Sequence, residues 1–160
     1  MTFSITRPAA RRIRPYTPEV FETTRSPVNL ELALRMCEAA VRQAAREGAL
    51  ISVAVVDAGG HLVAFQRMDG ARIAGPALAA GKAYTAVAHH MPTAELAPLV
   101  APGGELYGLA GDGYVCLGGG VPLTGARGDG GVRGAIGVSG GSIPQDVACA
   151  EAAAALCEGT

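Results

Sequence analysis

The sequence predicts a single α+β domain whose sheet is largely antiparallel and flanked by helices. One observation behind this is the apolar, β-branched run at 50–56, which is followed by a tight turn and a returning apolar run at 61–65. Such a pair of runs is typical of a hairpin. The other is the order of the remaining segments, with one helix before the hairpin and then a helix, further strands and a closing helix. A chain of 160 residues can bury a core of its own as one domain.

Residues 1–27 differ in composition from everything that follows. They contain five arginines and four prolines and show no sustained hydrophobic periodicity. We therefore expect 1–27 to be an extended or partly disordered leader and 28–160 to be the folded domain. The apolar residues of the leader could dock it on a neighbouring subunit. The arginines could alternatively form a nucleic-acid patch, although no lysine accompanies them.

The first predicted helix begins after Asn29, a favoured N-cap residue, and ends at Gly48. Its apolar residues recur at helical spacing and predict the buried face; they are Leu30, Leu34, Cys37, Val41 and Ala44. The run at 50–56 is too β-branched for a surface helix and predicts a buried strand. The turn at 57–60 then leads into its hairpin partner.

A second helix is expected over about 71–90, and Pro92 and Thr93 follow it, with Thr93 as the cap of a short helix. Beyond the glycine-rich loop at 101–112 we expect a strand at 114–117, a bend at 118–122 and a strand at 132–139. The closing helix spans about 143–157. Ser142 and Gln145 form a capping-box pattern at its start.

Composition and charge limit the partners. A net charge of −1 argues against nucleic acid or an anionic membrane, and no apolar run reaches the roughly 18 residues of a membrane span. The four cysteines have no zinc or redox spacing and lie in apolar segments, where free thiols behave as small hydrophobic groups. We expect a cytoplasmic protein whose partners are a small molecule and further copies of itself.

The segment 134–141 is the most informative part of the chain. Glycines interrupt an apolar strand that runs directly into a helix start. This pattern indicates that a ligand, a subunit or a neighbouring helix lies close to the strand backbone. A helix start also offers unpaired N–H groups to an anion. Gly137, Ser139 and Gly141 match the spacing of a nucleophile elbow, but that motif needs a later histidine, and all three histidines come earlier.

Several side chains are candidates for chemistry. Lys82 has small neighbours, so its stem could cross a crowded surface and pair with an anionic ligand, although a solvated lysine is the simpler interpretation. Asp57 either caps the hairpin turn or, if buried, acts as a base. His89 and His90 end the second helix, where they interact with its dipole or one of them ligates a metal or haem. Adjacent helical residues point about 100° apart, so at most one faces a given pocket.

Six segments in order together resemble the GlcG/HbpS-like haem-degrading domain family over about residues 28–158. They are VVDAGGHL at 55–62, RMDGA at 67–71, GKAYTA at 81–86, PTAEL at 92–96, GGGVP at 118–122 and GAIGVSGG at 134–141. The resemblance implies a profilin- or PAS-like α+β fold and assembly into dimers or larger rings, often octamers. It also implies binding of haem or related tetrapyrroles in some members.

Our leading hypothesis is therefore a small-molecule-binding protein of the haem-binding type, in which one of His89 and His90 ligates the iron. The residues expected around the cofactor are Lys82, Gly119, Gly120, Gly140, Gly141 and Ser142. Whether a reaction is catalysed stays open.

The alternative is a cofactor-free isomerase, lyase or cyclase acting on a small anionic or polyketide-like substrate. Asp57, Lys82, Tyr84 and the histidines would then be acid–base catalysts, and N–H groups near Gly140 and Gly141 would stabilise an oxyanion. A structural or sensory partner protein is the third alternative.

Composition also predicts assembly. Aromatic residues are only 4% of the chain, glycine occurs 23 times, and the closing helix is rich in alanine. Helix and sheet faces built from glycine and alanine have little side-chain volume, and they are stabilised best when two flat surfaces meet closely. We expect a closed homo-oligomer, a dimer at minimum, with the pocket beside or across a subunit boundary and the leader wrapping a neighbour.

Overall fold

The computed structural model describes residues 28–124 and 131–158, which form the predicted α+β arrangement. The helices are α1 (Leu30–Arg46), α2 (Gly75–His89), α3 (Thr93–Leu99) and α4 (Ile143–Glu158). The strands are β1 (Ser52–Asp57), β2 (Leu62–Arg67), β3 (Gly120–Thr124) and β4 (Val132–Ser139), and a short 3-10 helix, η2, spans Leu109–Asp112. The predicted leader at 1–27 lies outside the described residues.

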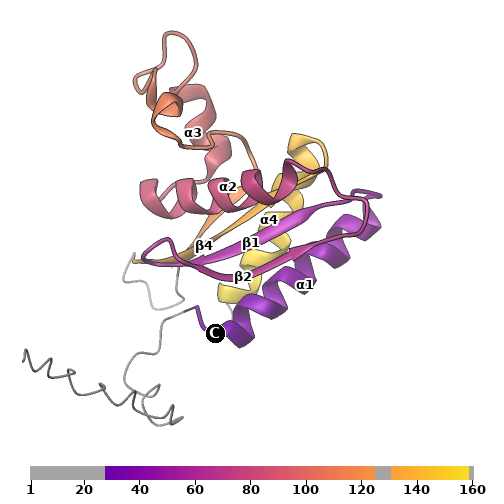
Figure 1. Cartoon of the computed structure of the whole chain (residues 1–160). Helices are drawn as coiled ribbons and strands as arrows, with labels where there is room; N and C mark the ends of the chain where they lie inside the picture. The colour runs from indigo at the N-terminus through magenta and orange to yellow at the C-terminus, as the bar shows by residue number, and fades with distance from the viewer. Residues whose placement is uncertain (1–27, 125–130, 159–160) are drawn as a thin grey trace, which may run out of the picture.

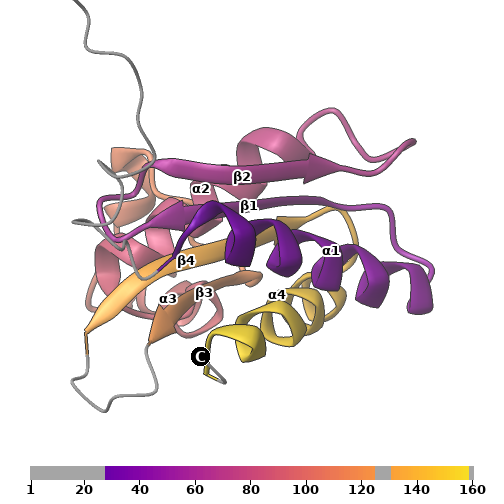
Figure 2. The same ribbon diagram turned by 90° about the horizontal axis from the view of Figure 1, so that it is seen from below.

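The four strands form one antiparallel sheet in the order β2-β1-β4-β3. Its two central strands align so that Ser52 faces Ser139 and Asp57 faces Gly134. Helix α2 covers one face of the sheet, and α1 and α4 lie side by side on the other (Figure 1, Figure 2). The larger buried cluster lies between the sheet and the α1–α4 layer, and a smaller one joins α2 to β1 and β4.

Three local signals in the sequence are confirmed. Asn29 caps α1 by accepting a hydrogen bond from the Leu32 amide at 2.8 Å. The 57–60 turn connects β1 to β2. At the start of α4, the Ser142 amide donates to Oε1 of Gln145 at 2.9 Å, as a capping box requires.

The predicted buried face of α1 is confirmed at Cys37 and Ala44 but not at Leu30 and Leu34. Leu30 and Leu34 are 57% and 41% exposed, whereas the buried residues are Leu32, Ala33, Met36, Cys37, Ala40 and Ala44. The helix is wedged between the sheet and α4, and small alanines allow that close approach. The prediction was wrong for the two leucines, which it favoured over the smaller alanines beside them.

The segment after α3 also differs from its prediction. Residues 114–117 are not a strand, because the Val115 amide donates to the Thr85 hydroxyl at 2.9 Å instead of entering a ladder. The strand β3 begins at Gly120, inside the predicted bend. It is an edge strand, and an edge tolerates Pro122.

Helix α2 begins at Gly75 rather than near 71, with a proline in its first turn. Thr93 does not cap α3, whose N-cap is Pro92. Instead its hydroxyl donates to the Leu117 carbonyl at 2.6 Å and accepts from the Gly120 amide at 2.8 Å, and so fixes the start of β3.

A neighbouring helix accounts for Gly137 in β4. A Cβ atom at Gly137 would overlap the Ala79 carbonyl oxygen and lie 2.5 Å from the Ala83 amide nitrogen. Helix α2 therefore packs directly on the backbone of β4, which brings Lys82 close to the sheet. No helix among the described residues is long and apolar enough to cross a membrane.

Candidate functional site

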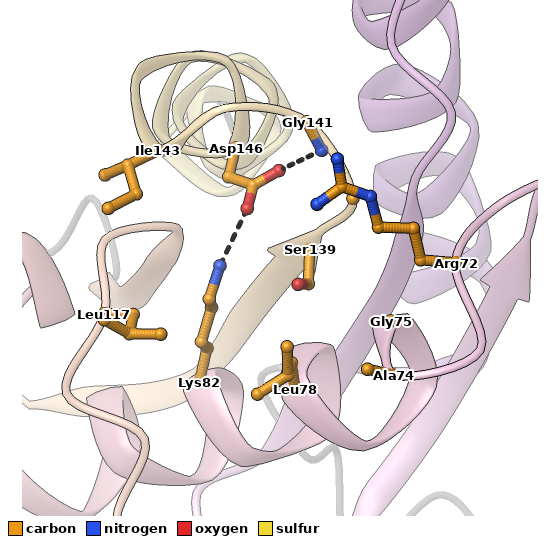
Figure 3. Close-up of a pocket in the computed structure, with 11 residues that line it drawn as sticks. Arg72, Ala74, Gly75, Leu78, Lys82, Leu117, Ser139, Gly141, Ile143 and Asp146 are labelled. Carbon is orange, nitrogen blue, oxygen red and sulfur yellow. Dashed lines mark hydrogen bonds and ion pairs between the residues drawn. The ribbon is translucent and has the colours of Figure 1, made fainter.

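A cavity of about 220 Å³ lies where the start of α2, the end of β4 and the start of α4 meet (Figure 3). Its polar lining comes from Arg72, Lys82, Ser139, Gly140, Gly141 and Asp146. Its apolar lining comes from Ala74, Gly75, Leu78, Leu117 and Ile143. The cavity thus combines several charged groups with an apolar wall, as small-molecule sites commonly do.

Lys82 and Asp146 form a buried ion pair at this cavity. The Lys82 ammonium donates to Oδ2 of Asp146 and to the Val138 carbonyl, each at 2.8 Å. Their side chains are only 3% and 5% exposed. The interpretation of Lys82 as a solvated lysine is therefore wrong, because the small residues around it in α2 let it cross to α4. Its charge is neutralised within the chain.

Gly119 and Gly120 pack against this ion pair and do not line the cavity. Gly119 has a φ of +115°, and a Cβ there would lie 3.1 Å from Nζ of Lys82 and 2.9 Å from Cβ of Asp146. A Cβ at Gly120 would lie 2.5 Å from the Lys82 carbonyl oxygen. These glycines let the 119–120 segment lie directly against Lys82 and Asp146, which is a structural reason for the glycine run at 118–120.

Arg72 supplies the second cation at the cavity, and nothing in the sequence indicated it. Its side chain is exposed and extends from the loop before α2 toward the start of α4 (Figure 3). Among the described residues it has no ion-pair or hydrogen-bond partner for its guanidinium group. An isolated arginine just before a helix gives little signal in a sequence. Asp146 was missed too, and an acid in the first turn of α4 is the signal that could have indicated it.

The start of α4 offers fewer free donors than expected. The Gly141 amide, proposed as an oxyanion donor, already donates to Oδ1 of Asp146 at 2.9 Å. The Ser142 amide and hydroxyl both donate to Oε1 of Gln145. Ser142 lies in a neighbouring open depression of about 550 Å³, which shares Arg72, Gly140 and Gly141 with the cavity.

His89 and His90 lie at the far end of α2 from the cavity and do not line it. His89 follows Lys82 by seven residues, which is about 10 Å along a helix axis. Its ring packs edge-on against Tyr114, with 4.6 Å between the ring centroids. Its Nε2 atom is buried without a hydrogen-bond partner. His90 is exposed and ends the helix in the left-handed conformation, with φ of 52°.

Tyr84 and Asp57 also lie at this end of the molecule. Tyr84 is 49% exposed, and its ring is nearly parallel to that of Tyr114, with 6.2 Å between the ring centroids. Tyr84 also packs against the 57–60 turn at Gly60. Lys82 and Tyr84 are two residues apart on α2 and so point in nearly opposite directions. The structure therefore does not bring Asp57, Lys82 and Tyr84 into one site.

Asp57 stabilises the hairpin turn. Its Oδ1 atom accepts hydrogen bonds from the Gly59 and His61 amides, each at 2.9 Å. Slight burial tends to raise the pKa of Asp57, but these two hydrogen bonds and the adjacent His61 side chain outweigh it, so the pKa lies below its ordinary value. At neutral pH this carboxylate is ionised and held by the turn, so it is poorly suited to act as a base.

The cysteines offer no nucleophile. All four are buried and none forms a disulfide, and burial raises the pKa of Cys37 and of Cys149 to about 11. Thiols in this state are protonated at neutral pH and unreactive. Residues 28–124 and 131–158 also contain no group of three or more side chains that could hold a metal ion.

The chain is similar to several known proteins in sequence and in structure. The model of the haem-degrading, HbpS-like protein family matches residues 28–155, which confirms the resemblance seen in the sequence. An uncharacterized 15.0 kDa protein from the dhaT–dhaS intergenic region of Citrobacter freundii is 37% identical over 129 residues, covering 79% of this chain and 89% of that protein. The corrinoid adenosyltransferase PduO of Salmonella typhimurium is 37% identical over 141 residues. That match covers 86% of this chain but only 41% of the adenosyltransferase.

Solved structures agree with this match. The Klebsiella pneumoniae protein ORFY superposes with a TM-score of 0.77 at 32% identity, covering 83% of this chain and 92% of ORFY. A PduOC:heme complex gives 0.75 at 36% identity, covering 81% of this chain and 94% of PduOC. An HbpS double mutant from Streptomyces reticuli gives 0.73 at 35% identity, covering 93% and 98% of the two chains.

Proposed function

This chain belongs to the HbpS-like haem-degrading protein family, and on that basis we propose that it binds haem. The observation that carries the proposal is the haem complex of PduOC, to which the chain is 36% identical over most of both lengths. Adenosyl transfer is not proposed, because the chain spans less than half of the PduO adenosyltransferase.

We place the proposed haem site at the histidine-bearing end of α2. His89 has a buried Nε2 atom without a hydrogen-bond partner, and a buried polar group in that state normally has a missing partner. Imidazole nitrogen is a common axial ligand of haem iron. The rings of Tyr84 and Tyr114 lie beside it and offer a flat aromatic surface. We therefore assign iron ligation to His89.

Binding there requires side chains that cover Nε2 to move aside. Tyr114 contacts the His89 ring and lies in a segment that has no strand hydrogen bonding, so its displacement breaks no sheet ladder. Haem supplies a redox-active iron when bound, and the chain supplies the imidazole of His89 and the ring of Tyr84. His90 is exposed and is the alternative ligand that the experiment below separates from His89.

The cavity at Lys82 is not proposed as the haem site. Its volume of about 220 Å³ is below the range of pockets that enclose drug-sized ligands, and a tetrapyrrole is larger than these. Catalysis by Asp57, Lys82 and Tyr84 is not proposed either, because these residues do not meet.

Titration with haemin tests the proposal. Wild-type protein at micromolar concentration should give a saturable shift of the Soret band. His89→Ala should lose the part of that shift that comes from coordination of the iron by the imidazole. His90→Ala and His61→Ala are matched controls that should keep the wild-type spectrum. Absence of any Soret shift in the wild-type protein would overturn haem binding. A normal spectrum for His89→Ala together with a changed one for His90→Ala would overturn only the assignment of the ligand.

A further inference from the structure

We propose that the cavity beside the Lys82–Asp146 ion pair binds a small carboxylate with an apolar body. The site is separate from the histidine-bearing end of α2, so the proposal does not rest on haem binding. It is carried by unpaired hydrogen-bond donors, an uncompensated positive charge and an exposed apolar rim.

Several hydrogen-bond donors at the cavity have no partner among the described residues. An ammonium group has three donors, and Lys82 uses two of them on Asp146 and Val138. Both oxygens of the Asp146 carboxylate already accept, one from Lys82 and one from the Gly141 amide. The Ser139 hydroxyl and the Arg72 guanidinium have no acceptor among the described residues. Because Lys82 is almost completely buried, an unused donor there is costly without a partner.

The charges at the cavity do not cancel. Lys82 and Asp146 neutralise each other, whereas Arg72 has no carboxylate within ion-pair distance among the described residues. A guanidinium group binds a carboxylate with two parallel hydrogen bonds, which favours this anion over a halide ion. One uncompensated positive charge favours a ligand with one carboxylate.

The rest of the lining is apolar. Leu117 and Ile143 both line the cavity and remain 47% and 54% exposed, so apolar surface lies directly beside its charged groups. The apolar part of a ligand seated between them would remove that surface from water. The volume of about 220 Å³ corresponds to about seven water molecules, which suits a short aliphatic or single-ring acid.

The test uses acetate, hexanoate and benzoate as probes, each with its neutral amide, and measures binding by calorimetry in the absence of haemin. We expect saturable binding of hexanoate or benzoate at least tenfold tighter than that of the amide, and weaker binding of acetate. Arg72→Ala should weaken binding at least tenfold. Arg35→Ala is the matched control, because it removes the same charge from an exposed position on α1, across the sheet from the cavity, and should leave binding unchanged.

Three results would overturn the proposal: no saturable binding of any acid, equal binding of acid and amide, or equal binding by Arg72→Ala and Arg35→Ala. Since Arg72 is exposed, the variant should fold, and an unchanged circular dichroism spectrum checks this. The Soret experiment uses a different ligand and a different variant, so failure of one proposal is distinguishable from failure of the other.

Discussion

Lys82 is the residue on which the cavity depends. It extends from α2 to α4, and its ammonium contacts Asp146 and the β4 backbone, so one side chain joins three elements. Taking two charges out of water is costly, and the pair is maintained only because further hydrogen bonds complete it. The Gly141 amide and the Val138 carbonyl supply these hydrogen bonds.

Breaking the pair from one side should destabilise the protein strongly. Lys82→Met leaves the Asp146 carboxylate buried without its cation, and we expect it to lower the free energy of unfolding by about 3–5 kcal/mol. Urea denaturation at neutral pH measures this change. The double variant with Asp146→Asn keeps an acceptor for the Gly141 amide but has no buried charge, so it should be more stable than Lys82→Met alone. A double variant that loses the sum of the two single losses would contradict coupling of the pair.

The sequence could not indicate this pairing, because the two residues are 64 positions apart. Small neighbours around Lys82 suggested a partly buried stem, and that much was confirmed. The partner depends on where α4 lies relative to α2, which only the packed sheet defines. By contrast, the turn role of Asp57 was available from the sequence, since its hydrogen bonds reach no further than four residues.

At the scale of elements, α2 packs on β4 at a position where the strand has no side chain. Gly137 meets the backbone of α2 directly, and so the helix lies low on the sheet. The glycine pattern of β4 predicted close approach, and the approaching group at this position is a helix. Interior packing of this kind leaves no room for an added atom.

Gly137→Ala should therefore lower the free energy of unfolding by about 1–3 kcal/mol, because the methyl group overlaps the Ala79 carbonyl and forces α2 outward. Gly111→Ala is the matched control: the same methyl group there meets no atom within 4 Å and no left-handed φ. It should change stability by at most about 0.5 kcal/mol. Urea denaturation of both variants checks the difference, and equal losses would show that the close approach is relaxed in solution.

The elements predicted correctly are those with local signals. The hairpin, β4 and the capped ends of α1 and α4 follow from apolar β-branched runs, turn residues and capping side chains within a few positions of each other. The segment 114–117 has the composition of a strand, yet its Val115 amide is held by Thr85, thirty residues earlier. Such a side-chain partner has no sequence signature, so the strand was placed a few residues too early.

At the scale of the whole molecule, the core is built largely from small residues. Alanines occupy many buried positions in both clusters, and the largest fully buried side chains are a methionine, isoleucines and leucines rather than aromatic rings. At the same time, Leu62 and Phe65 on the edge strand β2 remain exposed, and Ile73 is 95% exposed. A modest core together with uncovered apolar side chains favours association of chains.

We therefore expect a closed homo-oligomer, a dimer at minimum. Light scattering after gel filtration at micromolar concentration should give a mass at least twice the 16.1 kDa of one chain. Removal of residues 1–26 tests the expectation that the leader wraps a neighbour, and should lower the assembled mass or the melting temperature. Because apolar burial increases with the area shared between copies, Leu62→Asp should shift the equilibrium toward the single chain if β2 lies in the interface. A mass near 16.1 kDa for the wild-type chain would contradict assembly.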